Sequence, residues 1–298
     1  MFTGCGTALV TPFRADLSLD EPALRRLVRR QIEAGIDFLV PCGTTGESPT
    51  LARHEHLRVI EVALEEANGK VPVLGGAGGY STREGVELAR ELEHLGVDGI
   101  LSVTPYYNKP TQEGLYQHFQ AIASAISLPI IVYSVQGRTG VNVEPATLAR
   151  LAAIPNIVGV KEASGNIAQM ANVIQQVPPE FVVLSGDDAI TLPLMALGGR
   201  GVISVVSNEI PAEMTELARL CLASDFASAR ALQRKYLPLM EINFIESNPI
   251  PVKAALGLMG LLETVYRLPM VPPKAEHLAR IEKVLESVGL LGRVPVAG

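Results

Sequence analysis

One lysine stands where an apolar segment ends, a position from which its amine can do chemistry. Lys161 follows the apolar residues 157–160 and precedes Glu162. A segment this apolar is typical of a strand buried on both faces. Burial disfavours the charged form of a lysine, and a neutral amine attacks a carbonyl carbon to form a Schiff base. The alternative is a structural lysine whose stem crosses apolar surface and whose amine pairs with Glu162.

Three hydroxyl groups lie at or just after the ends of other apolar segments. They belong to Thr44, Tyr107 and Tyr133, and a hydroxyl near the amine can pass the proton that imine formation requires. Each has a structural alternative. Thr44 can belong to a plain turn rich in hydroxyls, Tyr107 can form an interface patch with Tyr106, and Tyr133 can be a core residue with its hydroxyl bonded.

Two further groups can bind carboxylates. Backbone N–H groups around Thr44 and Thr45 can hold one carboxylate in a concave turn. Arg138 can hold a second through two parallel hydrogen bonds, or it can simply pair with a surface acid. Imine formation needs an amine, a proton shuttle and a carboxylate anchor, and the chain supplies all three. The protonated imine is itself the electron sink, so this chemistry needs no metal or organic cofactor.

The histidines do not predict a metal site. His54 and His56 are two positions apart, and on a helix this spacing points the side chains away from each other. A metal-dependent aldolase needs a cluster of histidine and carboxylate ligands, and the spacing of the five histidines does not indicate one.

Short apolar segments alternate with longer amphipathic ones, and this alternation predicts the elements that position the reactive groups. The apolar segments are residues 6–10, 38–41, 71–75, 99–103, 129–135, 157–161, 181–185 and 201–205. Eight strand–helix units predict a (β/α)8 TIM barrel, in which catalytic groups gather at the carboxyl ends of the strands. A doubly wound open sheet is the alternative. The glycines at 75–79 lack its Gly-x-Gly-x-x-Gly spacing, however, and predict a flexible loop.

Capping residues mark two of the helices between these segments. Asp20 can cap a helix that has Pro22 in its first turn. Ser81 and Glu84 have the spacing of a capping box, and Gly96 is placed to end the helix that follows.

The strand-like segments stop before residue 224, and the rest of the chain has a helical pattern. Three helices are predicted near 225–243, 248–262 and 273–289. They form either an appendage packed on the barrel or a small all-α domain. We therefore expect a catalytic barrel over residues 1–224 and a C-terminal helical domain over residues 225–298.

The composition limits the classes of partner. The chain has 298 residues and a formal net charge of −6, which argues against a nucleic-acid partner. No apolar stretch is long enough to span a bilayer. The cysteines, Cys5, Cys42 and Cys221, are odd in number and widely spaced. This pattern fits free thiols in a reducing cytoplasm better than disulfides or a metal cluster.

Four short motifs contain the residues named so far. They are GTTGE at 43–47, TPYY at 104–107, Tyr133 with RTG at 138–140, and GVKE at 159–162. Together they resemble the motifs of the dihydrodipicolinate synthase family, which belongs to the pyruvate-dependent class I aldolase superfamily with N-acetylneuraminate lyase. The resemblance runs along essentially the whole chain, from 6–12 to 248–253, and it is specific because the motifs keep their order and spacing.

This resemblance implies a reaction. Pyruvate would condense with Lys161, and the resulting enamine would attack the aldehyde of L-aspartate 4-semialdehyde to give 4-hydroxy-tetrahydrodipicolinate, in the diaminopimelate route to lysine. Tyr133, Thr44 and Tyr107 would form the proton relay. Tyr107 would reach in from a neighbouring subunit, and the resemblance suggests a homotetramer built as a dimer of tight dimers.

The resemblance also assigns substrate-binding residues. Thr45 and the backbone at Ile203 would hold pyruvate, Gly186 would line the pocket, and Arg138 would bind the semialdehyde carboxylate. The lyase and sugar-acid branches of the superfamily generally lack this arginine, so Arg138 favours the dihydrodipicolinate branch. The alternative is an aldolase for a 2-keto-3-deoxy sugar acid or N-acetylneuraminate.

The chain departs from the family pattern just before Arg138. Where the family usually has Tyr-Asn-Val-Pro, this sequence has Ser134 and Gln136 in the second and fourth places. Loss of the proline loosens the turn that carries Arg138, and we still expect activity.

A second departure lies at the cavity where many family members bind lysine as a feedback inhibitor. Five residues of this chain fall in that region: Ser48, His56, Tyr80, Glu84 and Tyr106. His56, Glu84 and Tyr106 match the family's site, whereas Tyr80, together with Pro49 and Arg53, does not. Tyr80 would add bulk where the amine of the ligand is held. We therefore expect a degraded site and weak or absent inhibition by lysine.

Overall fold

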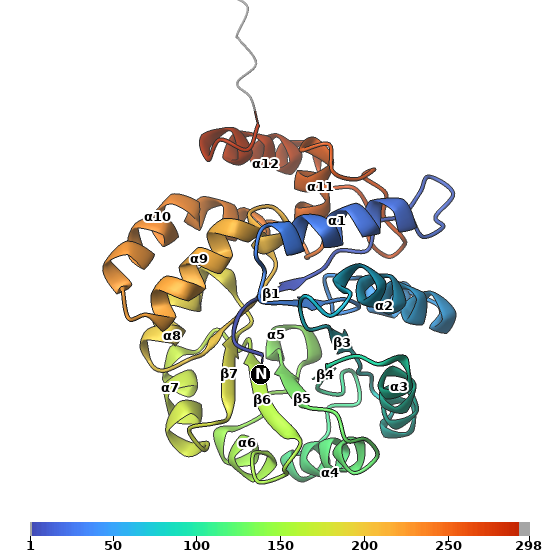
Figure 1. Cartoon of the computed structure of the whole chain (residues 1–298), viewed down its shortest axis with the longest axis vertical. Coiled ribbons are helices and arrows are strands. Elements are labelled where there is room, and N and C mark those ends of the chain that lie inside the picture. Colours follow the sequence, from blue (N-terminus) through green and yellow to red (C-terminus); the bar gives the residue numbers. More distant parts are fainter. Residues whose placement is uncertain (1, 292–298) are drawn as a thin grey trace, which may run out of the picture.

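Eight parallel strands form the centre of the structure, a computed structural model that describes residues 2–291 (Figure 1). They are β1 (Gly4–Ala8), β2 (Phe38–Val40), β3 (Leu74–Gly76), β4 (Gly99–Val103), β5 (Ile130–Ser134), β6 (Ile157–Glu162), β7 (Val182–Ser185) and β8 (Gly201–Ser204). The strand order is β2-β1-β8-β7-β6-β5-β4-β3. A parallel bridge between Leu39 and Val73 joins its two ends. The predicted (β/α)8 barrel is therefore confirmed.

Side chains fill the inside of the barrel. Alternate residues of the strands point inward and form one apolar cluster, which includes Leu101, Ile131, Leu184 and Ile203. Alternation along a strand puts every second residue on the same face, so the interior is a packed core with no central pore. Tyr133 of β5 belongs to the same inward-pointing set. Its partner in the strand pairing is Lys161 of β6, so the two side chains lie on the same face of the sheet.

Helices surround the barrel and alternate with its strands (Figure 1). They are α1 (Glu21–Glu33), α2 (Arg53–Ala67), α3 (Thr82–Leu95), α4 (Gln112–Ala123), α5 (Gln136–Thr139), α6 (Pro145–Leu151), α7 (Ile167–Gln176), α8 (Thr191–Ala196) and α9 (Pro211–Leu222), with 3-10 turns at Ser48–Thr50, Asp188–Ile190 and Val206–Asn208. The predicted single caps are present, and the predicted capping box is half formed, because Ser81 Oγ accepts the N–H of Glu84 at 3.4 Å without a return bond from the Glu84 side chain among the described residues. The Asp20 carboxylate accepts the N–H of Ala23 at 3.1 Å, and Gly96 ends α3 in the left-handed conformation.

Two predicted strands lie at shifted positions. The first runs over Gly4–Ala8 instead of 6–10, and the third over Leu74–Gly76 instead of 71–75. The prediction that 75–79 is a loop was therefore wrong for its first two glycines. A Cβ on Gly76 would lie 2.1 Å from the carbonyl oxygen of Cys42, so only glycine lets this strand approach the segment after β2 so closely.

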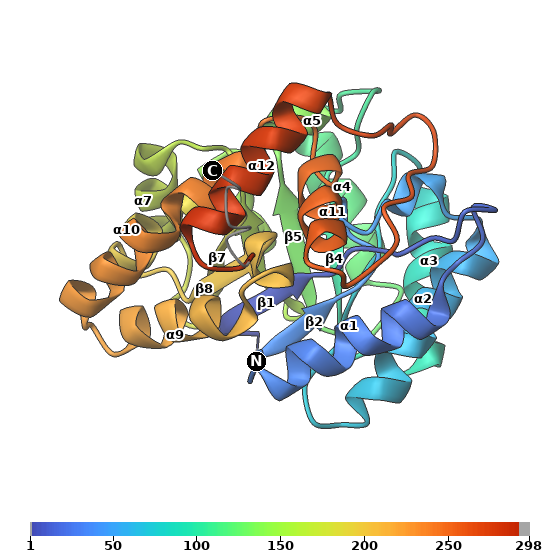
Figure 2. The same ribbon diagram turned by 90° about the horizontal axis from the view of Figure 1, so that it is seen from above.

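Three helices follow the barrel: α10 (Phe226–Ile242), α11 (Ile250–Leu258) and α12 (Ala275–Ser287). All three fall within the predicted ranges. α11 and α12 pack against each other and lie on the side of the barrel where α1 lies (Figures 1 and 2), and α10 packs against α9 and α12. A domain boundary at residue 224 stays a prediction, and residues 292–298 of the predicted C-terminal domain lie outside the described residues.

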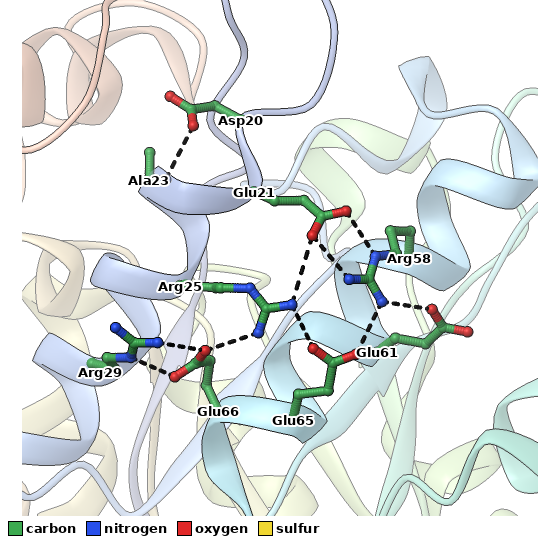
Figure 3. A network of polar contacts seen from close by, with 9 residues as sticks. All are labelled: Asp20, Glu21, Ala23, Arg25, Arg29, Arg58, Glu61, Glu65 and Glu66. Atoms are coloured by element: carbon green, nitrogen blue, oxygen red, sulfur yellow. Dashed lines mark hydrogen bonds and ion pairs between the residues drawn. The ribbon is translucent and has the colours of Figure 1, made fainter.

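The outer faces of α1 and α2 carry a network of ion pairs (Figure 3). Arg25 pairs with Glu66 at 2.8 Å, and Arg58 pairs with Glu21 at 2.8 Å and with Glu65 at 3.0 Å. These contacts link two helices that are neighbours around the barrel. None of the helices in the described part of the chain combines the length and apolar character needed to cross a lipid bilayer.

Candidate active site

Lys161 projects from β6 into a cavity at the end of the barrel. Its side chain is 5% exposed, and its Nζ lies 4.3 Å from the centre of the Tyr133 ring. The strand places the next residue, Glu162, on the opposite face, where its carboxylate accepts a hydrogen bond from Gln169 of α7 at 2.9 Å. Within residues 2–291, Lys161 forms no ion pair, so the alternative in which it pairs with Glu162 is wrong.

Tyr133 is held next to Lys161 by the pairing of β5 with β6. The two residues are direct partners in the parallel register, and Tyr133 is 6% exposed. Both residues therefore sit on rigid strands at the carboxyl end of the barrel, which is where this fold carries its catalytic groups. A hydroxyl on a buried ring beside a buried amine is suited to proton transfer.

The cavity around Lys161 has a volume of about 120 Å³. It is lined by six of the residues predicted for the site, which are Thr44, Thr45, Tyr133, Arg138, Lys161 and Gly186. These residues come from four separate strand ends, and the barrel brings them together. An amine, two kinds of hydroxyl and a guanidinium around one small cavity fit covalent chemistry on a carbonyl compound that carries carboxylates.

Gly186 makes room for the stem of Lys161. A Cβ at this position would lie 2.6 Å from the Cβ of Ala163 and 3.2 Å from the Cε of Lys161. The backbone N–H of Gly186 donates to the carbonyl of Glu162 at 2.8 Å, which holds this segment against β6. A larger residue would therefore force Ala163 to shift and would crowd the stem of the lysine.

The loop after β2 presents Thr44 and Thr45 to the cavity. The loop is a tight turn in which Gly46 N–H donates to the carbonyl of Gly43 and Glu47 N–H donates to the carbonyl of Thr44, both at 3.1 Å. Thr45 is 3% exposed, and its hydroxyl accepts a hydrogen bond from the Asn248 side chain at 2.9 Å.

Arg138 lies on the short helix α5 at the mouth of the cavity. One of its guanidinium nitrogens donates to the backbone carbonyl of Asn248 at 3.2 Å. The turn closes without the family's proline, because Arg138 N–H and Thr139 N–H both donate to the carbonyl of Val135 at 3.0 Å. Arg138 is exposed, so its remaining donors are accessible to a substrate.

Two of the predicted residues do not join this cavity within the chain. Tyr107 is 91% exposed, has a left-handed backbone with φ of 70°, and lines neither cavity described here. Ile203 is fully buried on β8 among the side chains that fill the barrel.

A larger cavity of about 450 Å³ adjoins the first and shares Thr44, Tyr133, Val135 and Arg138 with it. Of the residues predicted for a degraded lysine site, Ser48, His56 and Tyr106 line it, and Tyr80 and Glu84 do not. Tyr80 instead packs its ring edge-on against Tyr106, with ring centres 5.5 Å apart. Burial lowers the pKa of His56, whose Nε2 lies 2.8 Å from the carbonyl oxygen of Gly76.

Several residues of the first cavity were not predicted as site residues. They are Val135, Ala163, Asp187, Val205, Phe244 and Asn248. Asn248 contributes most, because its side chain bonds Thr45 and its carbonyl bonds Arg138. Two features of the sequence could have indicated this segment. Asn248 is a polar residue just before Pro249, and Lys253 is the one charged residue in the apolar helix that follows. Among residues 2–291, no group of three or more His, Cys, Asp or Glu side chains could hold a metal ion.

A sequence model of the dihydrodipicolinate synthetase family matches residues 1–288. This chain belongs to that family. It is 56% identical over 295 residues to the 4-hydroxy-tetrahydrodipicolinate synthase of Koribacter versatilis, covering 99% of this chain and 98% of that protein. A match of this length to the family confirms the resemblance that the four motifs indicated.

Solved structures of the family have the same fold along nearly the whole chain. The dihydrodipicolinate synthase from Thermotoga maritima gives a TM-score of 0.96 at 48% identity and covers 98% of this chain and 100% of that chain. The chloride-inhibited enzyme from Acinetobacter baumannii, solved in complex with pyruvate, gives 0.96 at 44% identity with the same coverage. The enzyme from Cyanidioschyzon merolae with lysine bound gives 0.95 at 40% identity, covering 97% of this chain and 99% of that one.

Proposed function

We propose that this chain is a 4-hydroxy-tetrahydrodipicolinate synthase, which condenses pyruvate with L-aspartate 4-semialdehyde in the diaminopimelate route to lysine. The observation that carries the proposal is the buried amine of Lys161, which faces the Tyr133 ring inside a cavity that Thr44, Thr45 and Arg138 also line. The full-length relatives named above support the same activity.

The reaction follows from the chemistry of the amine. Neutral Lys161 attacks the keto carbon of pyruvate, and loss of water gives an imine. Loss of a proton from the methyl carbon gives an enamine, and this carbon forms the new bond to the aldehyde carbon, whose oxygen takes up a proton. The amine of the semialdehyde then attacks the imine carbon, which closes the ring and releases Lys161. One water leaves overall, and no cofactor is required.

We assign the proton relay to Tyr133, Thr44 and Tyr107. Tyr133 and Thr44 line the Lys161 cavity, and both hydroxyls can exchange protons with the carbinolamine. Tyr107 is almost fully exposed on its own chain, which supports a role in the site of a neighbouring subunit. The working unit in this proposal is a homotetramer made of two tight dimers.

We assign the two substrate carboxylates to different sides of the cavity. Thr45, the N–H groups of its loop and the backbone at Ile203 would hold pyruvate, next to Gly186. Arg138 would hold the semialdehyde carboxylate at the mouth, where it has free donors. A guanidinium at the mouth of the cavity suits the carboxylate of the semialdehyde better than the hydroxyl groups of a long polyhydroxy acid, so the sugar-acid aldolase alternative is less favoured.

We further propose that lysine inhibits this enzyme weakly or not at all. Arg53 is one of the residues that line the larger cavity. Its guanidinium pairs with Glu91 at 2.8 Å, and its positive charge disfavours a cationic ligand nearby. An activity titration with lysine checks this, and inhibition at sub-millimolar concentrations would contradict it. The three cysteines are all free and buried, which supports a reducing, cytoplasmic location.

Borohydride trapping tests the function directly. Reduction in the presence of pyruvate should attach a three-carbon adduct to Lys161, located by peptide mass mapping. The variant Lys161→Ala should lose the adduct and keep its fold, whereas Lys70→Ala, which removes an exposed lysine, should label like the wild type. A label elsewhere, or none, rejects the mechanism. Assays with aspartate semialdehyde and with sugar acids then separate the two aldolase activities.

A further inference from the structure

The C-terminal segment grips the loop that carries Thr44 and Thr45. Three side chains from this segment reach residues 45–50. Their contacts are Asn248 Nδ2 to the Thr45 hydroxyl at 2.9 Å, Lys253 Nζ to a Glu47 carboxylate oxygen at 2.6 Å, and an Arg267 guanidinium nitrogen to the Thr50 carbonyl at 3.0 Å. The position of the loop therefore depends on a segment that lies about 200 residues away in the sequence.

The middle contact is a fully buried ion pair. The side chains of Lys253 and Glu47 are 0% and 2% exposed. Lys253 is the one charged residue of α11, and its Nζ lies 4.5 Å from the centre of the Phe13 ring and 5.3 Å from that of Tyr266. The ammonium of Lys253 therefore lies near two aromatic rings, and the carboxylate of Glu47 is its one strong partner among the described residues.

This pair is a poor device for stability alone. Burial of two charges costs more free energy than a modest pairing returns, and apolar residues of similar volume often serve as well or better. The second carboxylate oxygen of Glu47 is buried and has no hydrogen-bond partner among residues 2–291, so the pair is not even fully satisfied. Burial lowers the pKa of Lys253, although the carboxylate of Glu47 acts against this shift.

What the pair does supply is a fixed point next to the substrate cavity. Glu47 has a left-handed backbone with φ of 54°, and its N–H donates to the carbonyl of Thr44 at 3.1 Å. The peptide between Thr45 and Glu47 is also held in place, because the hydroxyl of Thr11 donates to the carbonyl of Gly46 at 2.7 Å. A shift of Glu47 would therefore be passed to Thr44 and Thr45 with little slack.

We propose that Glu47 and Lys253 are positioning residues that hold the loop of Thr44 and Thr45 in the geometry that binds the pyruvate carboxylate. The proposal rests on the proposed function, because it assigns that loop to pyruvate. Neither side chain lines the Lys161 cavity, so both act through the backbone of the loop. Their loss should weaken pyruvate binding without removing the reactive amine.

The test is a double variant that replaces the pair by apolar residues of similar length, Glu47→Met with Lys253→Met. It should fold with a thermal midpoint close to or above that of the wild type. The pyruvate concentration that gives half-maximal borohydride labelling of Lys161 should rise about tenfold or more, since small misplacements of binding groups cost this much. A matched variant of the exposed pair on α9, Glu216→Gln with Arg219→Met, should label like the wild type.

A purely structural role would lower the fraction of protein that can be labelled and leave the half-maximal pyruvate concentration unchanged. That result in a folded double variant overturns the proposal. If the double variant does not fold, Glu47→Asp decides instead. It keeps both charges, but the carboxylate is one methylene shorter and reaches Lys253 only if the loop moves. A wild-type pyruvate dependence in folded Glu47→Asp also overturns the proposal.

The two levels of proposal fail in different ways. If the wild type traps no pyruvate, the proposed function fails and the positioning role falls with it. If the wild type, the double Met variant and Glu47→Asp all trap pyruvate with the same concentration dependence, the proposed function stands and only the positioning role is rejected.

Discussion

Two regions of this molecule contain clustered charged side chains, and the clusters differ in how far they are exposed to solvent and in how many partners each charge has. On the outer faces of α1 and α2, Arg25 and Arg58 each pair with three glutamates, and the side chains are partly exposed (Figure 3). At the barrel mouth, Lys253 is buried with Glu47 as its one carboxylate within the described residues. Lys161 forms no ion pair there, and its Nζ lies 4.3 Å from the centre of the Tyr133 ring.

The difference shows what each region requires of its charges. Exposed pairs exchange partners and water freely, so each contributes about 0–1 kcal/mol and none has to be placed accurately. A buried charge with one partner is costly, and loss of that partner leaves it uncompensated. We infer that the buried charges at the barrel mouth position or carry out the chemistry of the site, whereas the exposed network joins α1 to α2. Substitutions at the mouth should therefore change activity far more than substitutions in the network.

The largest effect among the following variants is expected for Gly186→Ala. The new methyl group would lie 2.6 Å from Ala163 and 3.2 Å from the Cε of Lys161. Ala163 must then shift and the stem of Lys161 is crowded, and we expect kcat/KM to fall by about 100-fold. Steady-state kinetics and a thermal melt measure the effect. Gly79→Ala is the control, since a Cβ there meets no atom within 4 Å. Wild-type kinetics in Gly186→Ala would mean that the mouth is less tightly packed than these distances require.

Sequence reasoning found the reactive groups of the mouth but not their supports. Lys161 was predicted because a charge at the end of an apolar strand is a local pattern. Asn248 and Lys253 contact residues 203 and 206 positions away, and no local spacing encodes such contacts. Their one signal was the presence of polar groups in the otherwise apolar start of α11.

Strand limits were predicted less well than strand identities. The apolar run at 6–10 suggested a strand through Val10, yet β1 ends at Ala8 because the Val10 N–H donates to the side chain of Asn208 at 3.2 Å. At its start, the Gly4 N–H donates to the carbonyl of Arg200 at 2.9 Å. Tertiary hydrogen bonds thus set these limits, and periodicity alone cannot supply them.

A moderate effect is expected for Asp188→Asn, which tests whether buried charge at the mouth costs stability. Asp188 is 1% exposed, and its carboxylate accepts the N–H groups of Val205 and Val206 at 3.0 and 2.9 Å. Burial raises its pKa to about 6, above the ordinary value of 3.8. Between these values the folded protein binds more protons than the unfolded chain, so the free energy of unfolding falls as pH rises.

In the wild type this carboxyl should lower the free energy of unfolding by about 2 kcal/mol between pH 4 and pH 7. Urea titrations across this range should show a flatter pH dependence in Asp188→Asn. The exposed cap Asp225 is the contrasting control. Its bond to Ser228 lowers its pKa, so its contribution is lost as pH falls. An unchanged pH dependence in Asp188→Asn would mean that this carboxyl titrates normally.

The smallest effect is expected for Arg58→Met in the outer network. Arg58 pairs with Glu21, Glu61 and Glu65, and its loss leaves three glutamates without this partner. We expect the free energy of unfolding to fall by about 1 kcal/mol at low salt and by less at high salt, because salt screens exposed charges. Pyruvate dependence should match the wild type. A raised pyruvate requirement, or a salt-independent loss of several kcal/mol, would show that the two regions are not energetically separate. The contrast between exposed and buried charge would then fail, and α2 would be the connection, because it begins at Arg53, just beyond the 3-10 turn that follows Glu47.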